Sequence, residues 1–131
     1  MKKSTLFVVI LSSILLLMAT TCEDDIILTC EDRLVELNEL ELEIDNLVNV
    51  SECGENFECR YIAFGSKPCG GPWSYLIYTT SIDTLKLESL VNIYNANEEI
   101  YNFECDIVSD CSIPNPPIGF ECENNKCIPI F

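Results

Sequence analysis

The sequence contains no histidine among its 131 residues. The Ser-His-Asp and Cys-His arrangements of hydrolases and the histidine ligands of metal sites are therefore excluded. The Cys-x-x-Cys motif of thioredoxin-like oxidoreductases is absent as well. The one pair of adjacent glycines, Gly70-Gly71, lies between prolines and matches no phosphate-binding loop. We expect a protein that is not an enzyme and uses no cofactor, although chemistry by two close carboxylates stays open with 22 acidic residues.

Basic residues are scarce. Seven Lys and Arg against 22 Asp and Glu give a formal net charge of −15 at pH 7. Nucleic acid and anionic lipid headgroups should repel such a chain. We therefore expect no nucleic-acid partner, and any membrane association must come from an attached lipid.

Long hydrophobic runs are absent apart from Leu6 to Met18, which follows the charged start Met1-Lys2-Lys3. A charged start, an apolar centre of about 13 residues and small residues before Cys22 are typical of an export signal. The run is short of the ~20 apolar residues that a spanning helix needs. We predict a signal peptide over residues 1–21, with a retained membrane anchor as the alternative.

Cys22 stands where the lipid-attachment cysteine of a bacterial lipoprotein would stand. The preceding residues resemble a lipobox, but Thr21 and Ala19 depart from its usual residues. Ordinary cleavage near Thr21 is the alternative, yet it would leave an unpaired thiol in an oxidising compartment, which favours lipidation. Residues 22–29 are predicted to form an acidic tether. Its Glu23-Asp24-Asp25 run resembles the signal that carries some Bacteroidetes-type lipoproteins to the outer face of the outer membrane. The location is therefore predicted to be the outer membrane or cell surface, or else secreted and soluble.

The other eight cysteines form an even set in a short exported domain, which predicts four disulfides. They allow on the order of 100 connectivities, and the sequence alone does not choose among them. Zinc is the rival interpretation, but the tight Cys-x2-Cys pairs of zinc sites are missing, and no calcium-loop spacing is present, so we predict no metal. The candidates are Cys30, Cys53, Cys59, Cys69, Cys105, Cys111, Cys122 and Cys127.

Residues 30–131 should form one domain, made of an acidic helix over 30–48 and a core over 53–131. The first helix follows from apolar residues at helical spacing, with acids on the opposite face. Strands are predicted at 60–64 and 73–79, and a second helix at about 82–103 with Thr80 or Ser81 as its N-cap. The fold class is therefore α+β, a small disulfide-stapled domain with two main helices and a short antiparallel sheet. The expected inner positions of the two helices are Leu34, Leu37, Leu40, Ile44 and Leu47, and Leu87, Leu90, Val91, Tyr94 and Tyr101.

Two further short strands, 119–122 and 127–130, flank Asn124-Asn125, which is a type I′ hairpin signal. With this two-residue loop, Cys122 faces Cys127 at a non-hydrogen-bonded pair, where side chains approach most closely. A Cys122–Cys127 bridge is therefore one of the possible pairings.

Two loops are candidate recognition elements. The loop from Gly65 to Trp73 contains Lys67 and Trp73, which are rare residue types here, although a Trp beside such turns commonly packs over a sheet edge. The segment Cys111–Cys122 contains Pro114, Pro116 and Pro117, and a proline-stiffened loop binds with little loss of entropy. It superficially resembles the binding loops of small protease inhibitors, with a rigid connector as the plainer interpretation.

Residues Ala63-Phe64-Gly65-Ser66-Lys67-Pro68-Cys69-Gly70-Gly71-Pro72-Trp73, with the later Ser109-Asp110-Cys111, Pro116-Pro117 and the Cys122–Cys127 hairpin, resemble a family of small secreted bacterial proteins. The resemblance covers about the last 73 residues of the chain. It implies export and a shared fold and does not imply an activity. Taken together, we expect a lipid-anchored extracytoplasmic protein that binds an unknown protein or small-molecule ligand. The alternative is a small protease inhibitor that acts through Cys111–Cys122.

Overall fold

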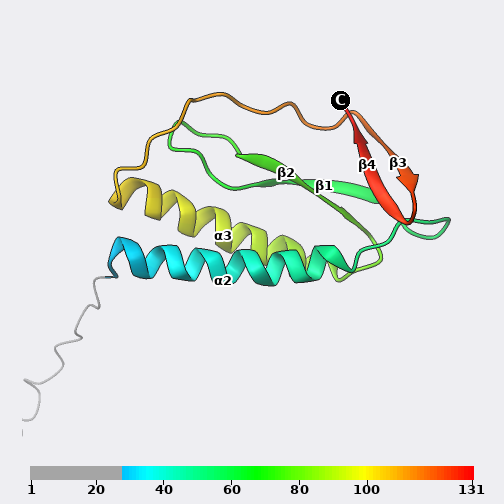
Figure 1. The fold of residues 1–131 in the computed structure, drawn as a ribbon, viewed down its shortest axis with the longest axis horizontal. Coiled ribbons are helices and arrows are strands. Elements are labelled where there is room, and N and C mark those ends of the chain that lie inside the picture. The colour runs from blue at the N-terminus through cyan, green and yellow to red at the C-terminus, as the bar shows by residue number, and fades with distance from the viewer. Residues whose placement is uncertain (1–27) are drawn as a thin grey trace, which may run out of the picture.

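The computed structural model describes residues 28–131 (Figure 1). The predicted signal peptide, lipid attachment at Cys22 and most of the tether lie outside these residues. The predicted α+β class, with two helices, short antiparallel strand pairs and four disulfides, is confirmed. The elements in chain order are α2 (Cys30–Asn49), β1 (Cys59–Phe64), β2 (Ser74–Thr79), α3 (Thr84–Glu104), β3 (Gly119–Glu123) and β4 (Lys126–Ile130).

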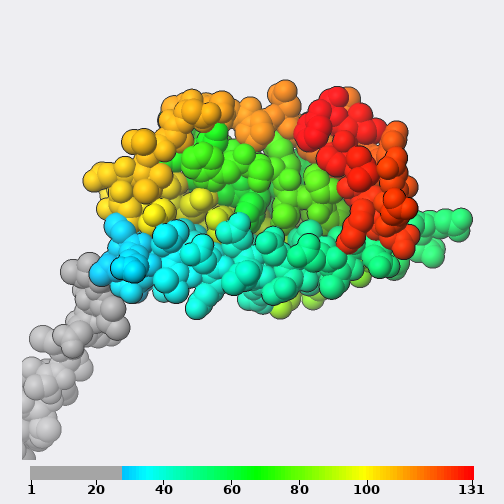
Figure 2. Space-filling view, viewed as in Figure 1, coloured from blue at the N-terminus to red at the C-terminus, as the bar shows by residue number. Residues whose placement is uncertain are grey.

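The elements lie in layers (Figure 1). Helices α2 and α3 run antiparallel to each other, and the β1–β2 hairpin lies along the helix pair. The segment that follows α3 crosses over that hairpin and leads to β3 and β4 at the other end of the domain. The β1–β2 loop, the end of α3 and the start of α2 are thereby gathered at one end (Figure 2).

The strands form two separate two-stranded sheets rather than one. Strands β1 and β2 pair antiparallel from Cys59↔Thr79 to Phe64↔Ser74. Strands β3 and β4 pair from Gly119↔Ile130 to Glu123↔Lys126. Asn124 and Asn125 have φ values of 50° and 63°, as the predicted type I′ turn requires.

Helix α2 begins at a capping box. The Thr29 hydroxyl accepts from the Asp32 backbone N–H at 3.2 Å, and the Asp32 carboxylate accepts from the Thr29 backbone N–H at 3.0 Å. Leu37 and Ile44 of the predicted stripe are buried, whereas Leu34 is 43% exposed. The acidic face points away from the core, and only a narrow apolar stripe packs against α3 and β2.

The N-cap of helix α3 lies two or three residues later than predicted. Asp83 is the cap, and its carboxylate accepts from the Lys86 backbone N–H at 3.0 Å. The prediction of Thr80 or Ser81 was wrong because both hydroxyls bond to another segment. The Thr80 hydroxyl accepts from Glu58 N–H, and the Ser81 hydroxyl accepts from Glu52 N–H, each at 3.0 Å.

The core lies between the helices and the β1–β2 hairpin. Tyr94 of α3 stacks on Phe64 of β1 with ring centroids 4.6 Å apart. Burial raises the pKa of Tyr94 to about 12, with Glu98 and Glu41 adding to the shift. Of the predicted α3 positions, Tyr101 is only partly buried. The buried apolar cluster consists of Leu37, Ile44, Tyr78, Leu87, Leu90, Val91 and Tyr94.

The four disulfides join segments that are far apart in the chain. They are Cys30–Cys105, Cys53–Cys122, Cys59–Cys127 and Cys69–Cys111, with Cα atoms 5.9, 5.9, 5.9 and 5.2 Å apart. The first connects the start of α2 to the end of α3. The next two connect the C-terminal hairpin to the segment around the start of β1, and the last connects the β1–β2 loop to the segment after α3.

The possible Cys122–Cys127 bridge was wrong, although the two residues do lie opposite each other in the hairpin. Each bonds to a cysteine of the neighbouring segment because the hairpin docks there. Lys126 Nζ donates to the carbonyls of Asn49 and Ser51 at 2.8 and 3.0 Å. This docking brings Cys53 and Cys59 within reach.

Candidate functional site

The β1–β2 loop is held in place by backbone turns and by helix α3. Gly65, Gly70 and Gly71 have positive φ values of 80°, 88° and 84°, which glycine adopts readily. The Lys67 N–H donates to the Gly71 carbonyl and the Gly70 N–H to the Lys67 carbonyl, both at 2.8 Å. The loop is therefore a compact turn.

Three polar side chains of α3 bind the loop backbone. Asn95 accepts from Gly65 N–H at 2.7 Å through its amide oxygen, and its amide nitrogen donates to the Ala63 carbonyl at 3.2 Å. Glu98 accepts from Ser66 N–H, and Asn102 donates to the Ser66 carbonyl. Spacings of three and four residues place these side chains on one face of the helix. We call Asn95, Glu98 and Asn102 the α3 polar row.

Glu98 is the ionisable member of the α3 polar row. Burial raises its pKa above the usual value of a glutamate. Hydrogen bonds from Ser66 and Trp73 lower the pKa in part, and the charge of Glu41 raises it. The site therefore disfavours the charged carboxylate while it uses that group as an acceptor for the loop.

Lys67 connects the loop to the segment after α3. Its side chain is buried, with 6% of the residue exposed. Its Nζ donates to Asp110 Oδ1 at 2.8 Å and to the Ser112 carbonyl, and it lies 4.8 Å from the ring centroid of Trp73. The hydrogen bond from Lys67 lowers the pKa of Asp110 to about 2, together with hydrogen bonds from Ser112.

The two predicted recognition loops meet where the Lys67 contacts lie. The Cys69–Cys111 disulfide joins them covalently. A Cβ atom added at Gly71 would lie 3.3 Å from Ile113, which shows how closely the backbone and the Ile113 side chain approach. The β1–β2 loop and the start of the proline-rich segment therefore form one rigid surface.

A cavity of about 880 Å³ opens beside this surface. One wall is the loop from Ser66 to Gly71, and the other is the last turns of α3 with residues 106–108. We call it the loop–helix cavity. Its helix-side lining residues are Glu99, Asn102, Phe103, Asp106, Ile107 and Val108.

The lining combines exposed apolar side chains with uncompensated acids. Phe103 and Val108 are 85% and 86% exposed, so both apolar side chains are open to contact with a ligand. Glu99 and Asp106 carry negative charge and make no ion pair with a basic residue among residues 28–131. The charge of Lys67 is already matched by Asp110. The cavity therefore has a negative net charge and an apolar rim.

The predicted recognition residues differ in their accessibility. Trp73 is 40% exposed, whereas Lys67 lies inside the junction and presents little surface to a ligand. Pro116 is exposed, Pro114 is half-buried and Pro117 is buried. Only part of the proline-rich segment is therefore open to a partner.

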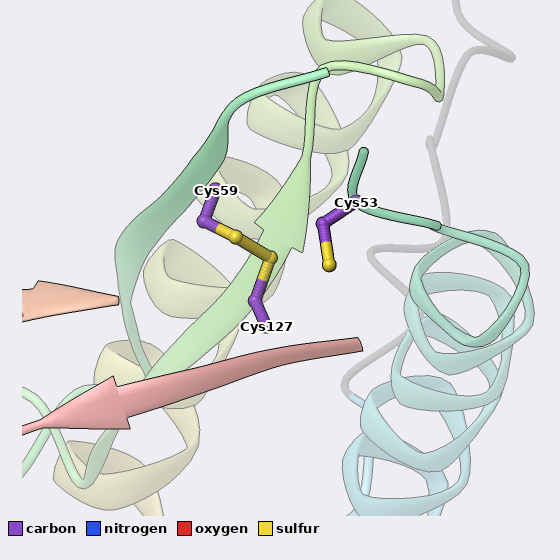
Figure 3. Close-up of side chains that lie close together, drawn as sticks. All are labelled: Cys53, Cys59 and Cys127. Atoms are coloured by element: carbon purple, nitrogen blue, oxygen red, sulfur yellow. A yellow bond between two sulfur atoms is a disulfide. The ribbon is translucent and has the colours of Figure 1, made fainter. Parts of the chain in front are cut away.

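A second group of side chains has the composition of a metal site. The sulfur atoms of Cys53, Cys59 and Cys127 lie within 4.8 Å of one another (Figure 3). Cys59 is bonded to Cys127 and Cys53 to Cys122, so none of them is a thiolate in this state. Metal ions bind cysteine as the thiolate. The three residues therefore belong to two adjacent disulfides, Cys53–Cys122 and Cys59–Cys127. We call these four cysteines the four-cysteine cluster.

Comparison with protein-family models, with curated proteins and with solved structures gives no match. The resemblance to small secreted proteins stays a prediction. Four disulfides fit an oxidising compartment outside the cytoplasm. Within residues 28–131, none of the helices has the length and apolarity that crossing a membrane requires.

Sequence reasoning missed the α3 polar row and the helix-side wall of the loop–helix cavity. A signal for the row was present, because Asn95, Glu98 and Asn102 recur at helical spacing beside the predicted apolar stripe. The cavity had no such signal, since it depends on where the Cys69–Cys111 bridge places the two segments.

Proposed function

We propose that the chain is an exported, lipid-anchored binding protein whose ligand occupies the loop–helix cavity. The observation that supports this most directly is the cavity itself, whose volume of about 880 Å³ falls within the range of small-molecule sites. Its walls are cross-linked by Cys69–Cys111 on the loop side and Cys30–Cys105 on the helix side. A site built on fixed walls loses little entropy when it binds.

The charge of the cavity selects the ligand class. Glu99 and Asp106 favour a cationic group, and the exposed ring of Phe103 offers both apolar contact and a π face for a cation. The net charge of −15 on the whole chain adds long-range attraction for cations. We therefore expect an amine or guanidinium group attached to an apolar body, such as a basic and apolar peptide segment.

The anchor would place this site near the membrane. The eight residues from Cys22 to Thr29 can span at most ~28 Å when fully extended. Helix α2 starts at the same end of the domain as the end of α3 (Figure 1), and the last turns of α3 line the loop–helix cavity. A lipid on Cys22 would thus hold the ligand site within a few nanometres of the bilayer surface.

Binding can be tested by titrating ¹⁵N-labelled protein with short peptides that contain Arg or Lys beside Leu. We expect amide shifts at residues 66–71 and 99–108, weaker shifts at high salt, and none with the matching Glu peptides. Phe103→Ala and Asp106→Asn should weaken binding, whereas Phe131→Ala, at a ring that is 73% exposed and lies outside the cavity, should not. Equal shifts with the acidic peptides, or shifts confined to other residues, would contradict this assignment.

The anchor is tested separately by mass spectrometry of the membrane fraction. A mature chain that begins with diacylglyceryl-modified Cys22 is expected, and Cys22→Ser should release the protein from the membrane. An unmodified N-terminus near Thr21 would show a secreted protein instead and would leave the cavity proposal standing.

Protease inhibition is the second candidate, supported by the exposure of the proline-rich segment. Ile113 and Ile118 are 62% and 80% exposed, and the segment is fixed at one end by Cys69–Cys111 and at the other by a 2.8 Å bond from Ile118 N–H to Ile130. Titration against a panel of serine proteases tests it. Inhibition that disappears when residues 114–118 are replaced by Gly and Ser would support this candidate, and the absence of inhibition would remove it.

A further inference from the structure

The two disulfides of the four-cysteine cluster lie side by side. The sulfur atoms of Cys53, Cys59 and Cys127 are mutually within 4.8 Å, and the sulfur of Cys122 is bonded to that of Cys53 (Figure 3). The other two disulfides, Cys30–Cys105 and Cys69–Cys111, do not belong to any such group in the described part of the chain. Four sulfur atoms in one place allow more than one pairing.

The backbone is compatible with a second pairing. Cys122 and Cys127 are direct partners in the β3–β4 register, one step from the closing pair Glu123↔Lys126. Cys122 and Cys127 therefore form a non-hydrogen-bonded pair, in which the Cα atoms are roughly 4.5 Å apart, and this separation is inside the range that a disulfide tolerates. Cys53 and Cys59 flank a tight turn in which Phe57 N–H donates to the Gly54 carbonyl at 3.2 Å. Their sulfur atoms are thus within reach of each other without movement of distant segments.

We infer that the four-cysteine cluster is a thiol–disulfide exchange site, at which an external thiolate converts Cys53–Cys122 and Cys59–Cys127 into Cys53–Cys59 and Cys122–Cys127. Exchange proceeds by attack of a thiolate on a disulfide sulfur. Cys122 is exposed and Cys53 is 5% exposed, so Cys122 is the entry point. The partner is a low-molecular-weight thiol or a thiol oxidoreductase.

The conversion takes three balanced steps. The external thiolate bonds to the sulfur of Cys122, and the Cys53–Cys122 bond breaks with its electron pair left on Cys53. The Cys53 thiolate bonds to Cys59, and the Cys59–Cys127 bond breaks to leave a thiolate on Cys127. The Cys127 thiolate then bonds to Cys122 and expels the external thiolate. Two disulfides exist before and after, no group is oxidised or reduced overall, and the thiolate acts as a catalyst.

The conversion changes how the C-terminal hairpin is attached. The observed bridges join residues 69 and 68 positions apart and connect the hairpin to the 53–59 segment. In the second pairing both bridges are local, so β3 and β4 keep only non-covalent contacts to that segment. The non-covalent contacts to this segment and its neighbours include the Lys126 bonds to Asn49 and Ser51, the 3.0 Å bond from Cys53 N–H to the Asn125 carbonyl, and the contact between the Phe120 and Tyr61 rings. Exchange therefore switches the hairpin from a covalent to a non-covalent attachment.

The first test incubates the oxidised full domain with a mixture of reduced and oxidised glutathione, followed by acid quenching, alkylation and peptide mapping. Trypsin cleaves after Lys126, between Cys122 and Cys127, and a Glu-specific protease cleaves after Glu55 and Glu58, between Cys53 and Cys59. We expect linked peptides for Cys122–Cys127 and Cys53–Cys59 to appear, while Cys30–Cys105 and Cys69–Cys111 are unchanged. Lys126→Met, which removes two of these non-covalent bonds, should increase the exchanged fraction several-fold. In this variant the Glu-specific protease, which cleaves after Glu123, separates Cys122 from Cys127.

The second test needs no added thiol. Cys122→Ser leaves Cys53 free beside Cys59–Cys127, and we expect part of the protein to contain a Cys53–Cys59 bridge with Cys127 free. The matched control is Cys111→Ser, which leaves Cys69 free and should keep Cys30–Cys105 intact. Complete alkylation of Cys53 with Cys59–Cys127 unchanged, or glutathione reactions that give only free thiols and never the local bridges, would overturn the inference.

Discussion

The ammonium nitrogen of Lys67 lies 2.8 Å from Oδ1 of Asp110, although 43 positions separate the two residues in the chain. The lysine is buried and the aspartate side chain is 69% exposed. This asymmetric pair joins the β1–β2 loop to the segment after α3, beside the Cys69–Cys111 bridge. Lys67 therefore connects two surface loops from inside the domain, and its charge is paired with that of Asp110.

Removing the Lys67 charge should loosen both loops. Lys67→Met keeps the length of the side chain and loses its bonds to Asp110 and Ser112, which should cost about 1–3 kcal/mol in the free energy of unfolding. Chemical denaturation measures this loss, and hydrogen exchange should become faster at residues 66–73 and 109–113. Lys86→Met is the control, because Lys86 is half exposed and pairs with Glu43 on the helix surface, and it should change stability little. An equal effect of both variants would contradict the role of Lys67.

Acid should weaken the same junction. The pKa of Asp110 is lowered from 3.8 in the unfolded chain to about 2 in the folded state by its hydrogen bonds with Lys67 and Ser112. A depressed pKa gives a stabilisation that is fully present above pH 4 and is lost as the pH falls through about 2. Thermal melts between pH 5 and pH 2 should show this loss, and Asp110→Asn should reduce the slope. An unchanged slope in Asp110→Asn would show that other carboxyl groups carry the acid sensitivity.

Glu98 should have the opposite pH dependence. Its pKa is raised chiefly by burial, so the neutral form is favoured and its contribution to stability declines as the pH rises through the folded pKa. Glu98→Gln keeps an oxygen that can accept from Ser66 N–H and removes the charge. We expect an unchanged or higher melting temperature for this variant at pH 7, with a smaller difference from the parent at pH 4. A clear fall in melting temperature at pH 7 would show that the charged form is needed.

Alanine substitutions at two glycines of the β1–β2 loop can distinguish the cost of backbone strain from the cost of a steric clash. Gly70 and Gly65 both have positive φ, but a Cβ at Gly70 would meet nothing within 4 Å, whereas one at Gly65 would lie 2.5 Å from Cδ1 of Trp73. Gly70→Ala should therefore cost about 1–2 kcal/mol from its backbone conformation alone. Gly65→Ala should cost about 1–3 kcal/mol more, because Trp73 or the loop must move. Urea denaturation of both variants measures the difference, and equal losses would place Trp73 away from Gly65 in solution.

The Cys30–Cys105 bridge should stabilise the helix pair strongly. Replacing both cysteines by serine should cost about 2–4 kcal/mol, since the bridge closes a long loop and the unfolded chain gains the most freedom when it is removed. Arg33 supports the same end through its ion pair with Glu104 at 2.6 Å, so Arg33→Met should weaken the double variant further. Thermal unfolding measures both effects. A double variant as stable as the parent would show that helix packing alone holds this end.

The helices and the C-terminal hairpin could be predicted from the sequence, but the disulfides that connect them could not. The helices follow from apolar residues at helical spacing, and the C-terminal hairpin follows from Asn124-Asn125. Each is a local property, set within a few residues. The pairing of Cys122 is not local, because Cys127 faces it in the hairpin while the docking of that hairpin brings Cys53 to it instead.

The N-cap of α3 shows the same limit at smaller scale. Thr80 and Ser81 have the side chains of good N-caps, but their hydroxyls accept hydrogen bonds from the backbone N–H groups of residues 58 and 52. Asp83 caps the helix instead. The loop–helix cavity depends on similar long-range contacts. Its walls are recognisable only once the α3 polar row and the Cys69–Cys111 bridge are seen to hold the loop against the helix.

The bridge at the start of α2 also determines how mechanical load would enter the domain. A force that pulls on the N-terminal chain acts at Thr29 and Cys30. The disulfide to Cys105 transmits part of this force directly to the C-terminal end of α3. Because the helices run antiparallel, the force is shared by both from their adjacent ends, and α2 cannot be peeled from the core turn by turn without breaking a covalent bond. Shear flow or a tug from a bound ligand would therefore be resisted by the helix pair as a unit.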